Sequence, residues 1–110
     1  MRRTQPVSIA DLYRFKIPIE PSVSPDGKRV VFTLERMHKQ DKTYYTNLYL
    51  TGTNGRGLKQ LTFSKRNDRS PIWSPNGKQI AFIRKRESAS QIWILSMKGG
   101  EARALTKLPG

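Results

Sequence analysis

The chain has 110 residues, of which 21 are Lys or Arg and 8 are Asp or Glu, giving a formal net charge of +13 at pH 7. It contains no cysteine, which excludes a disulfide framework and a thiolate metal site. The acidic residues and the single histidine are scattered, so neither a metal nor a cofactor is expected. Residues 1–16 lack the apolar core of a secretory signal, and the apolar runs 80–83 and 92–95 are far too short to span a membrane. We therefore expect a soluble, cytoplasmic protein.

Residues 1–19 are predicted to form an N-terminal helical segment. Ser8 and Asp11 have the spacing of a capping box, and an apolar face follows over residues 9–15. Pro18 is expected to end this helix. We expect the helix to pack on the strands that follow it.

Two copies of a short turn organise the rest of the chain. Residues 24–28, Ser-Pro-Asp-Gly-Lys, return as residues 74–78, Ser-Pro-Asn-Gly-Lys. Pro fixes φ at the second position, Asp or Asn suits the third, and Gly takes the left-handed conformation at the fourth. Each copy therefore predicts a type I turn with a Gly bulge that closes a β-hairpin. Further segments repeat at offsets of 50 and then 44 residues: 29–33 with 79–83, 47–50 with 91–94, and 60–62 with 104–106.

A repeat of about 40 to 50 residues containing four strands is typical of propeller blades. We predict an all-β fold of two four-stranded antiparallel blades, an incomplete β-propeller, preceded by the short helix. The predicted units are the helical segment 1–19, blade 1 at 20–62, and blade 2 with the start of the next connection at 63–110. The predicted strands are 20–24, 29–35, 45–51 and 57–61, then 70–74, 79–84, 90–96 and 102–105. Residues 36–43 are predicted to be a polar loop, and 63–69 the connection between blades.

Two blades are fewer than the roughly three repeats that a stable stack needs. We therefore expect the chain to be the N-terminal part of a longer protein. The uncovered blade edges and faces predict self-association of the isolated chain.

The repeated pattern, Pro-x-x-Ser-Pro-Asp-Gly-Lys followed by an apolar-x-Phe strand and closed by Leu-Thr, extends over residues 21–106. It resembles the propeller repeat of the prolyl oligopeptidase family of serine peptidases, above all its acylaminoacyl-peptidase and dipeptidyl-peptidase branches. That resemblance implies a propeller that gates the access of short peptides to a C-terminal hydrolase domain, which is the expected partner. The N-terminal helix could then reach back to that domain. The repeat is also similar to TolB-like propellers, which implies instead a non-enzymatic module for protein–protein interaction. TolB-like proteins are exported, so the missing signal argues against that alternative.

No catalytic residue is predicted in the chain. The hydrolase elbow Gly-x-Ser-x-Gly is absent, and the resemblance places the catalytic triad in a domain that these residues do not include. The single histidine, His38, is expected to be a solvated loop residue. The dipeptidyl-peptidase branch holds the amino end of its substrate with paired glutamates, whereas the glutamates here are isolated in sequence: Glu20, Glu35, Glu87 and Glu101.

The two dense basic groups, Lys65-Arg66 with Arg69 and residues 84–86, are predicted to lie in or beside loops as solvated rims. Because no aromatic residue interleaves with 84–86 to stack a base, nucleic-acid binding is not expected, despite the charge. Trp73 and Trp93 are expected in the core or between blades rather than as ligand platforms.

Overall fold

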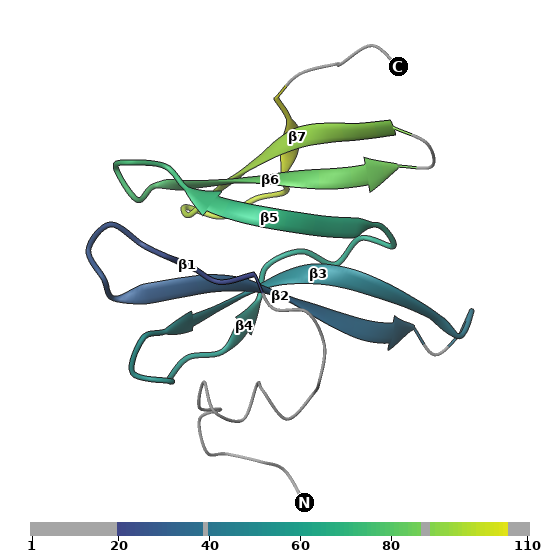
Figure 1. Cartoon of the computed structure of the whole chain (residues 1–110), viewed down its shortest axis with the longest axis horizontal. Coiled ribbons are helices and arrows are strands. Elements are labelled where there is room, and N and C mark those ends of the chain that lie inside the picture. Colours follow the sequence, from purple (N-terminus) through teal and green to yellow (C-terminus); the bar gives the residue numbers. More distant parts are fainter. Residues whose placement is uncertain (1–19, 39, 87–88, 106–110) are drawn as a thin grey trace, which may run out of the picture.

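The computed structural model describes residues 20–38, 40–86 and 89–105, and in these ranges it consists of two four-stranded antiparallel sheets (Figure 1). Blade 1 contains β1 (Ser22–Val23), β2 (Arg29–His38), β3 (Thr43–Gly52) and β4 (Lys59–Gln60). Blade 2 contains β5 (Asn67–Trp73), β6 (Gln79–Arg86), β7 (Ala89–Ser96) and β8 (Arg103–Ala104). Each sheet follows chain order, so the prediction of two antiparallel blades is confirmed. The predicted helix at 9–15 lies outside the described residues, and the predicted domain boundaries stay predictions.

The two repeated turns have the same atomic structure. Gly27 donates its N–H to the Ser24 carbonyl at 2.8 Å, and the corresponding bond of the second turn, from Gly77 to Ser74, is 2.9 Å. The φ angles of the two glycines are 73° and 72°, in the left-handed region. The Ser24 hydroxyl donates to Asp26 Oδ1 at 2.6 Å and accepts from the backbone N–H five residues ahead at 3.0 Å, and the second turn repeats both bonds. The predicted turn chemistry is confirmed in both copies.

The β2–β3 hairpin is longer than the sequence predicts. Residues 36–38 and 43–44 continue the antiparallel ladder, in which His38 pairs with Thr43, so the prediction of a loop at 36–43 is wrong. Threonine and tyrosine favour strands, and Met37 and Tyr44 at this hairpin end are exposed by 49% and 58%. The Tyr45 hydroxyl donates to Asp41 Oδ2 at 3.0 Å near the tip.

Strand β5 begins at Asn67, so the connection predicted at 63–69 ends earlier than expected. Its register shifts between Arg69 and Ile72, where Ser70 has a φ of 55°. Such a bulge lets Pro71, which has no N–H to donate, remain inside a strand. The strand was predicted to start at residue 70, whereas Ser70 and Pro71 lie at an irregularity within β5.

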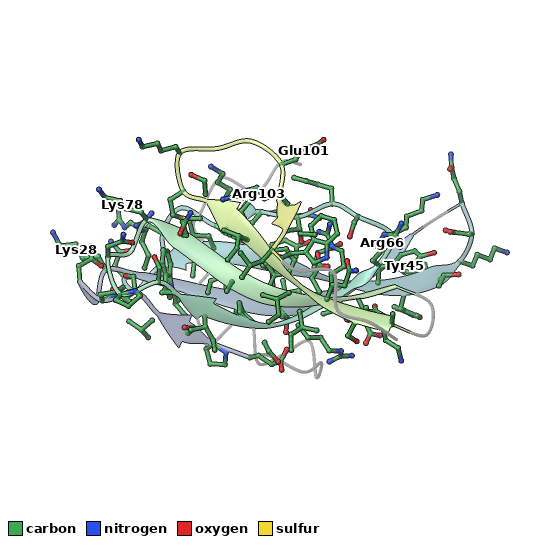
Figure 2. The ribbon with its side chains drawn as sticks, turned by 90° about the horizontal axis from the view of Figure 1, so that it is seen from above. Lys28, Tyr45, Arg66, Lys78, Glu101 and Arg103 are labelled. Atoms are coloured by element: carbon green, nitrogen blue, oxygen red, sulfur yellow. The ribbon has the colours of Figure 1, made fainter. Side chains whose placement is uncertain are left out.

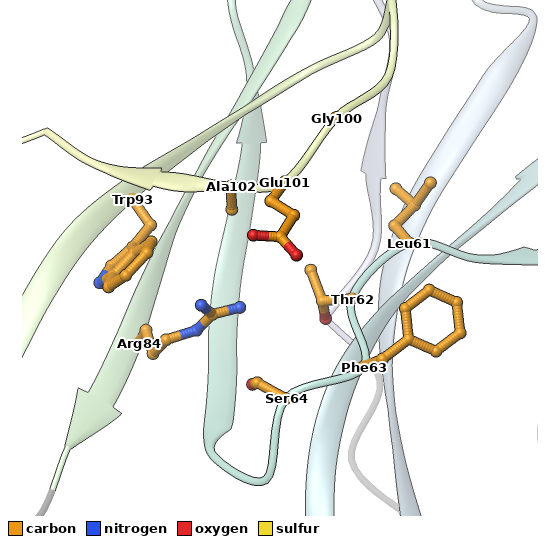
Figure 3. Close-up of a pocket in the computed structure, with 9 residues that line it drawn as sticks. All are labelled: Leu61, Thr62, Phe63, Ser64, Arg84, Trp93, Gly100, Glu101 and Ala102. Carbon is orange, nitrogen blue, oxygen red and sulfur yellow. The ribbon is translucent and has the colours of Figure 1, made fainter.

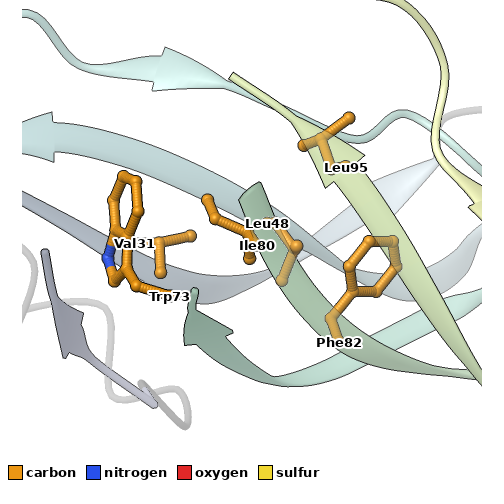
Figure 4. Packing of buried hydrophobic residues seen from close by; sticks show 6 residues of the cluster. All are labelled: Val31, Leu48, Trp73, Ile80, Phe82 and Leu95. Carbon is orange, nitrogen blue, oxygen red and sulfur yellow. The ribbon is translucent and has the colours of Figure 1, made fainter. Parts of the chain in front are cut away.

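The blades stack face to face, with β5 lying against β2 and β3 (Figure 1). A buried apolar cluster fills the interface (Figure 4). It comprises Val31 and Leu48 of blade 1 with Trp73, Ile80, Phe82 and Leu95 of blade 2. The opposite face of blade 1 carries a second cluster around Val30 and Phe32, which are only 6% and 1% exposed. Blade 1 thus buries apolar side chains on both faces, as a blade within a stack does.

Trp73 fastens the two blades to each other. Its indole Nε1–H donates to the Ser22 carbonyl across the interface at 2.8 Å. The Arg29 guanidinium lies over the indole ring, 4.9 Å from its centroid, and also approaches the Met97 sulfur at 3.7 Å. The prediction that Trp73 packs between the blades is confirmed.

Candidate functional site

A cavity of 550 Å³ lies between the outer parts of the two blades (Figure 3). The connection between β4 and β5 forms one side, and strands β6 and β7 together with the loop before β8 form the other. Its lining residues are Leu61, Thr62, Phe63, Ser64, Arg84, Trp93, Gly100, Glu101 and Ala102. The site therefore depends on both blades being in place.

Arg84, which lines the cavity, forms a buried ion pair with Asp68 behind it. Arg84 donates from Nε to Asp68 Oδ1 at 2.7 Å and from Nη2 to Oδ2 at 3.1 Å. The Asp68 side chain is fully buried and Arg84 is 8% exposed. Its guanidinium also lies 4.5 Å from the ring centroid of Trp93 and 5.3 Å from that of Phe82. Charge, hydrogen bonds and aromatic faces together hold Arg84 in one position.

The prediction that residues 84–86 form a solvated rim is therefore wrong for Arg84. The sequence did contain a signal, because Ile80, Phe82 and Arg84 alternate along one strand and so share one face. Lys85 points to the opposite face and is exposed, as the prediction required. No aromatic residue interleaves with residues 84–86 in the sequence, but the neighbouring strand brings Trp93 against Arg84.

Trp93 is half-buried and packs against the inter-blade cluster, as predicted for it. Its Nε1 is buried and has no hydrogen-bond partner within the described residues, and the same holds for the Ser64 hydroxyl. Both side chains line the cavity. Both atoms are covered by protein, and the lining beside them includes the apolar side chains of Leu61 and Phe63.

Three of the four glutamates predicted to be isolated lie in the described residues. The Glu20 carboxylate accepts from the Ser70 backbone N–H at 3.0 Å and from its hydroxyl at 3.4 Å, so it joins the blades. Glu35 lies within β2, and Glu101 lines the cavity. Glu87 lies outside the described residues. His38 is the last residue of β2 rather than a loop residue, and its solvation stays a prediction.

Two groups away from the cavity have shifted pKa values. The hydrogen bond from the Ser24 hydroxyl, supported by the Lys28 backbone N–H, lowers the pKa of Asp26. The hydrogen bond with Asp41 raises the pKa of Tyr45. Both shifts come from local hydrogen bonds at hairpin ends, so neither indicates a catalytic group.

The remaining basic side chains are spread over the molecule. Figure 2 shows Lys28 and Lys78 at one end of it and Arg66 at the other. Lys65 Nζ lies 3.9 Å from Asp41 Oδ2, in a pair that is largely exposed. Within ranges 20–38, 40–86 and 89–105, no group of three or more His, Asp or Glu side chains could hold a metal ion. The described part also contains no helix long and apolar enough to cross a membrane.

Stacked four-stranded antiparallel blades with a repeated Ser-Pro-Asp/Asn-Gly-Lys turn define a β-propeller repeat protein. The family profile of the TolB β-propeller domain matches residues 9–108, and the chain belongs to that family.

Similar proteins include two peptidases and a TolB. The chain is 35% identical over 91 residues to the uncharacterized peptidase YuxL of Bacillus subtilis (strain 168), covering 82% of this chain and 14% of the relative. It is 35% identical over 89 residues to dipeptidyl-peptidase 5 of Porphyromonas endodontalis, covering 81% of this chain and 13% of that protein. The crystal structure of TolB from Acinetobacter baumannii superposes with a TM-score of 0.69 and 26% identity, over 83% of this chain and 21% of the other. The chain thus spans about a seventh of the length of the two peptidases.

Proposed function

We propose that this chain is the N-terminal propeller portion of a serine peptidase resembling the acylaminoacyl-peptidases, and that it gates substrate access to a hydrolase domain. The observation that carries the proposal is the 35% identity to two peptidases over more than four fifths of the chain. The described residues form a cavity but contain no candidate nucleophile–base pair beside it. The chain's only histidine, His38, is the last residue of β2, and no residue of β2 lines the cavity. Chemistry would then reside in the hydrolase domain, and this chain would be inactive alone.

A gate limits substrates by size, and the stacked blades suit that role. The interface combines a buried apolar cluster with hydrogen bonds across the blades from Trp73 to Ser22 and from Ser70 to Glu20. Such an interface resists the separation of the blades, so a large substrate would not pass between them. A short peptide would reach the active site, and a folded protein would not.

The test uses the whole polypeptide encoded by the gene. We expect it to react with a fluorophosphonate probe, which labels activated serines, and to release acetylated amino acids from short acyl-peptides. The 110-residue chain alone should not react. Failure of the whole polypeptide to react would refute the peptidase assignment. Equal rates on a short acyl-peptide and on the same sequence inside a folded protein would refute the gate alone.

The alternative is a non-enzymatic propeller that binds another protein, as proposed above for TolB-like chains. The family membership and the TolB superposition favour it. In that case the whole polypeptide would not react with the fluorophosphonate probe. A cytoplasmic location also stays a prediction, and fractionation of cells into cytoplasm and periplasm would test it.

A further inference from the structure

One edge of the Arg84 guanidinium is open to the cavity between the blades. Its Nε–H and one N–H of Nη2 bind the two Asp68 oxygens from the side. Within the described residues, Nη1 takes part in no hydrogen bond or ion pair. Figure 3 shows the guanidinium pointing into the space between Ser64 and Glu101. The edge formed by Nη1 and Nη2 carries two parallel N–H groups, the arrangement that matches the two oxygens of a carboxylate.

This edge is held in place before any ligand arrives. Arg84 is only 8% exposed, and the Asp68 carboxylate that fixes its other edge is fully buried. The rings of Trp93 and Phe82 lie 4.5 and 5.3 Å from the guanidinium. An arginine on the surface loses side-chain freedom when it binds an anion, whereas Arg84 has already lost it on folding. Binding here therefore costs less conformational entropy than binding at an exposed arginine.

Glu101 places a negative charge on the opposite side of the cavity. Its carboxylate is directed toward the Arg84 guanidinium in Figure 3, yet no ion pair joins the two within the described part of the chain. A simple anion at the guanidinium edge would be repelled by Glu101, and a simple cation at Glu101 would be repelled by Arg84. A ligand that carries both charges meets an opposite charge at each end.

The rest of the lining is suited to an apolar group. Leu61, Phe63 and Ala102 contribute apolar surface, and the Phe63 side chain is 67% exposed although it lines the cavity. An aliphatic group in the cavity would remove part of that surface from water. The volume of 550 Å³ lies within the range of roughly 300 to 1,000 Å³ that small-molecule sites occupy.

We propose that the cavity binds a small zwitterion with an apolar side chain, either a free amino acid or a dipeptide. The ligand's carboxylate accepts hydrogen bonds from the free edge of Arg84, and its ammonium group pairs with Glu101. Its side chain packs against Phe63. The site needs only the two blades of this chain, so it does not rest on the proposed gate or on a hydrolase domain.

Titration of the full 110-residue chain with leucyl-leucine and with leucine tests the site. We expect saturable NMR shifts of the backbone amides at 61–64 and 100–102, with the affinity measured by calorimetry. The ligand that binds more tightly identifies the length that reaches both charges. Acetylating its amino group or amidating its carboxylate should each weaken binding by about tenfold or more, because each removes one charged contact.

Variants assign the two charged contacts to their residues. Glu101→Gln should bind the free and the acetylated ligand equally weakly. Glu35→Gln is the matched control, since it makes the same change in β2, which does not line the cavity, and should bind like the wild type. Arg84→Lys keeps the charge but lacks the two-pronged edge, so it should lose the preference for the free over the amidated ligand. If that variant does not fold, the amidated ligand tests the same contact on the wild-type chain.

The proposal would be overturned if neither ligand saturated the chain, or if the acetylated or amidated ligand bound as tightly as the free one. Equal losses in Glu101→Gln and Glu35→Gln would also overturn it. These measurements need no catalytic turnover. Their outcome is therefore separate from that of the fluorophosphonate experiment, and either proposal can fail while the other stands.

Discussion

Replacing Asp68 by Asn should strongly destabilise the fold. The carboxylate is fully buried and binds both Nε and Nη2 of Arg84, at 2.7 and 3.1 Å. The amide of asparagine keeps the shape of the side chain but removes its charge, and it presents an N–H group to one of the two guanidinium donors. The Arg84 cation would remain in place, 8% exposed, without its counter-charge.

The size of the effect follows from that burial. Exposed ion pairs contribute about 1 kcal/mol or less, whereas removing one partner of a buried pair costs roughly 3 to 5 kcal/mol, because the other charge stays desolvated. The Trp93 ring, 4.5 Å from the guanidinium, retains part of the stabilisation of Arg84 after the substitution. We therefore expect Asp68→Asn to lower the free energy of unfolding by about 3 kcal/mol.

Urea unfolding followed by circular dichroism measures this loss. Lys85→Ala is the matched control, since this exposed neighbour of Arg84 should change the stability by less than about 0.5 kcal/mol. Arg84→Leu installs the residue found at the equivalent position of blade 1, Leu34, but leaves the Asp68 carboxylate unpaired. The double variant should cost at least about 2 kcal/mol less than the sum of the two single ones. A cost below about 1 kcal/mol for Asp68→Asn, or simple additivity in the double variant, would refute the buried-pair interpretation.

Three further changes test the turns and the blade interface. Ser24→Ala should raise the pKa of Asp26 back toward its ordinary value of 3.8 in an NMR titration, and an unchanged midpoint would contradict the assigned cause. Because folding lowers this pKa, the Asp26 carboxylate stabilises the fold above pH 3.8, and the contribution is lost as the pH falls through the pKa of the folded state. The free energy of unfolding of Ser24→Ala should therefore depend less on pH in this acid range than that of the wild type. Gly27→Ala should cost about 1 kcal/mol in urea unfolding because φ is 73°, and Gly27→Asn should cost less. Trp73→Phe should cost about 1 to 2 kcal/mol through its lost hydrogen bond. It should cost more than Trp93→Phe, because Trp93 Nε1 has no hydrogen-bond partner within the described residues; the reverse order would be inconsistent with the interface described.

The turns and the blade architecture could be predicted because local backbone chemistry determines them. Pro25 fixes its own φ, Asp26 bonds to the backbone two residues ahead, and Gly27 adopts a conformation that other residues resist. The second copy at 74–78 repeats these requirements, and the distance between copies sets the repeat. Such signals do not depend on what packs against the strands.

The ends of strands and the cavity could not be predicted in this way. Residues 36–38 and 43–44, most of them polar, extend a hairpin through backbone hydrogen bonds that composition does not reveal. In the sequence, Asp68 lies in a predicted connection and Arg84 in a basic group, so neither residue indicates that they form a pair. The register of β5 against β6 brings them together. The cavity itself is formed by a connection from one blade and strands from the other, so it exists only after the blades stack.

Comparison of the two blades shows where a propeller of this kind can acquire a function. Leu34 and Arg84 occupy equivalent repeat positions, yet Leu34 packs in an apolar cluster whereas Arg84 forms a charged wall of the cavity. The turn at 24–28 and its copy, in contrast, keep the same bonds at nearly the same distances. The residue types of a turn can vary little between repeats because the backbone conformation requires them. Residues at a blade interface need only pack against the neighbouring blade. Differences between repeats should therefore collect at the interfaces, and the cavity beside Arg84 lies at one of them.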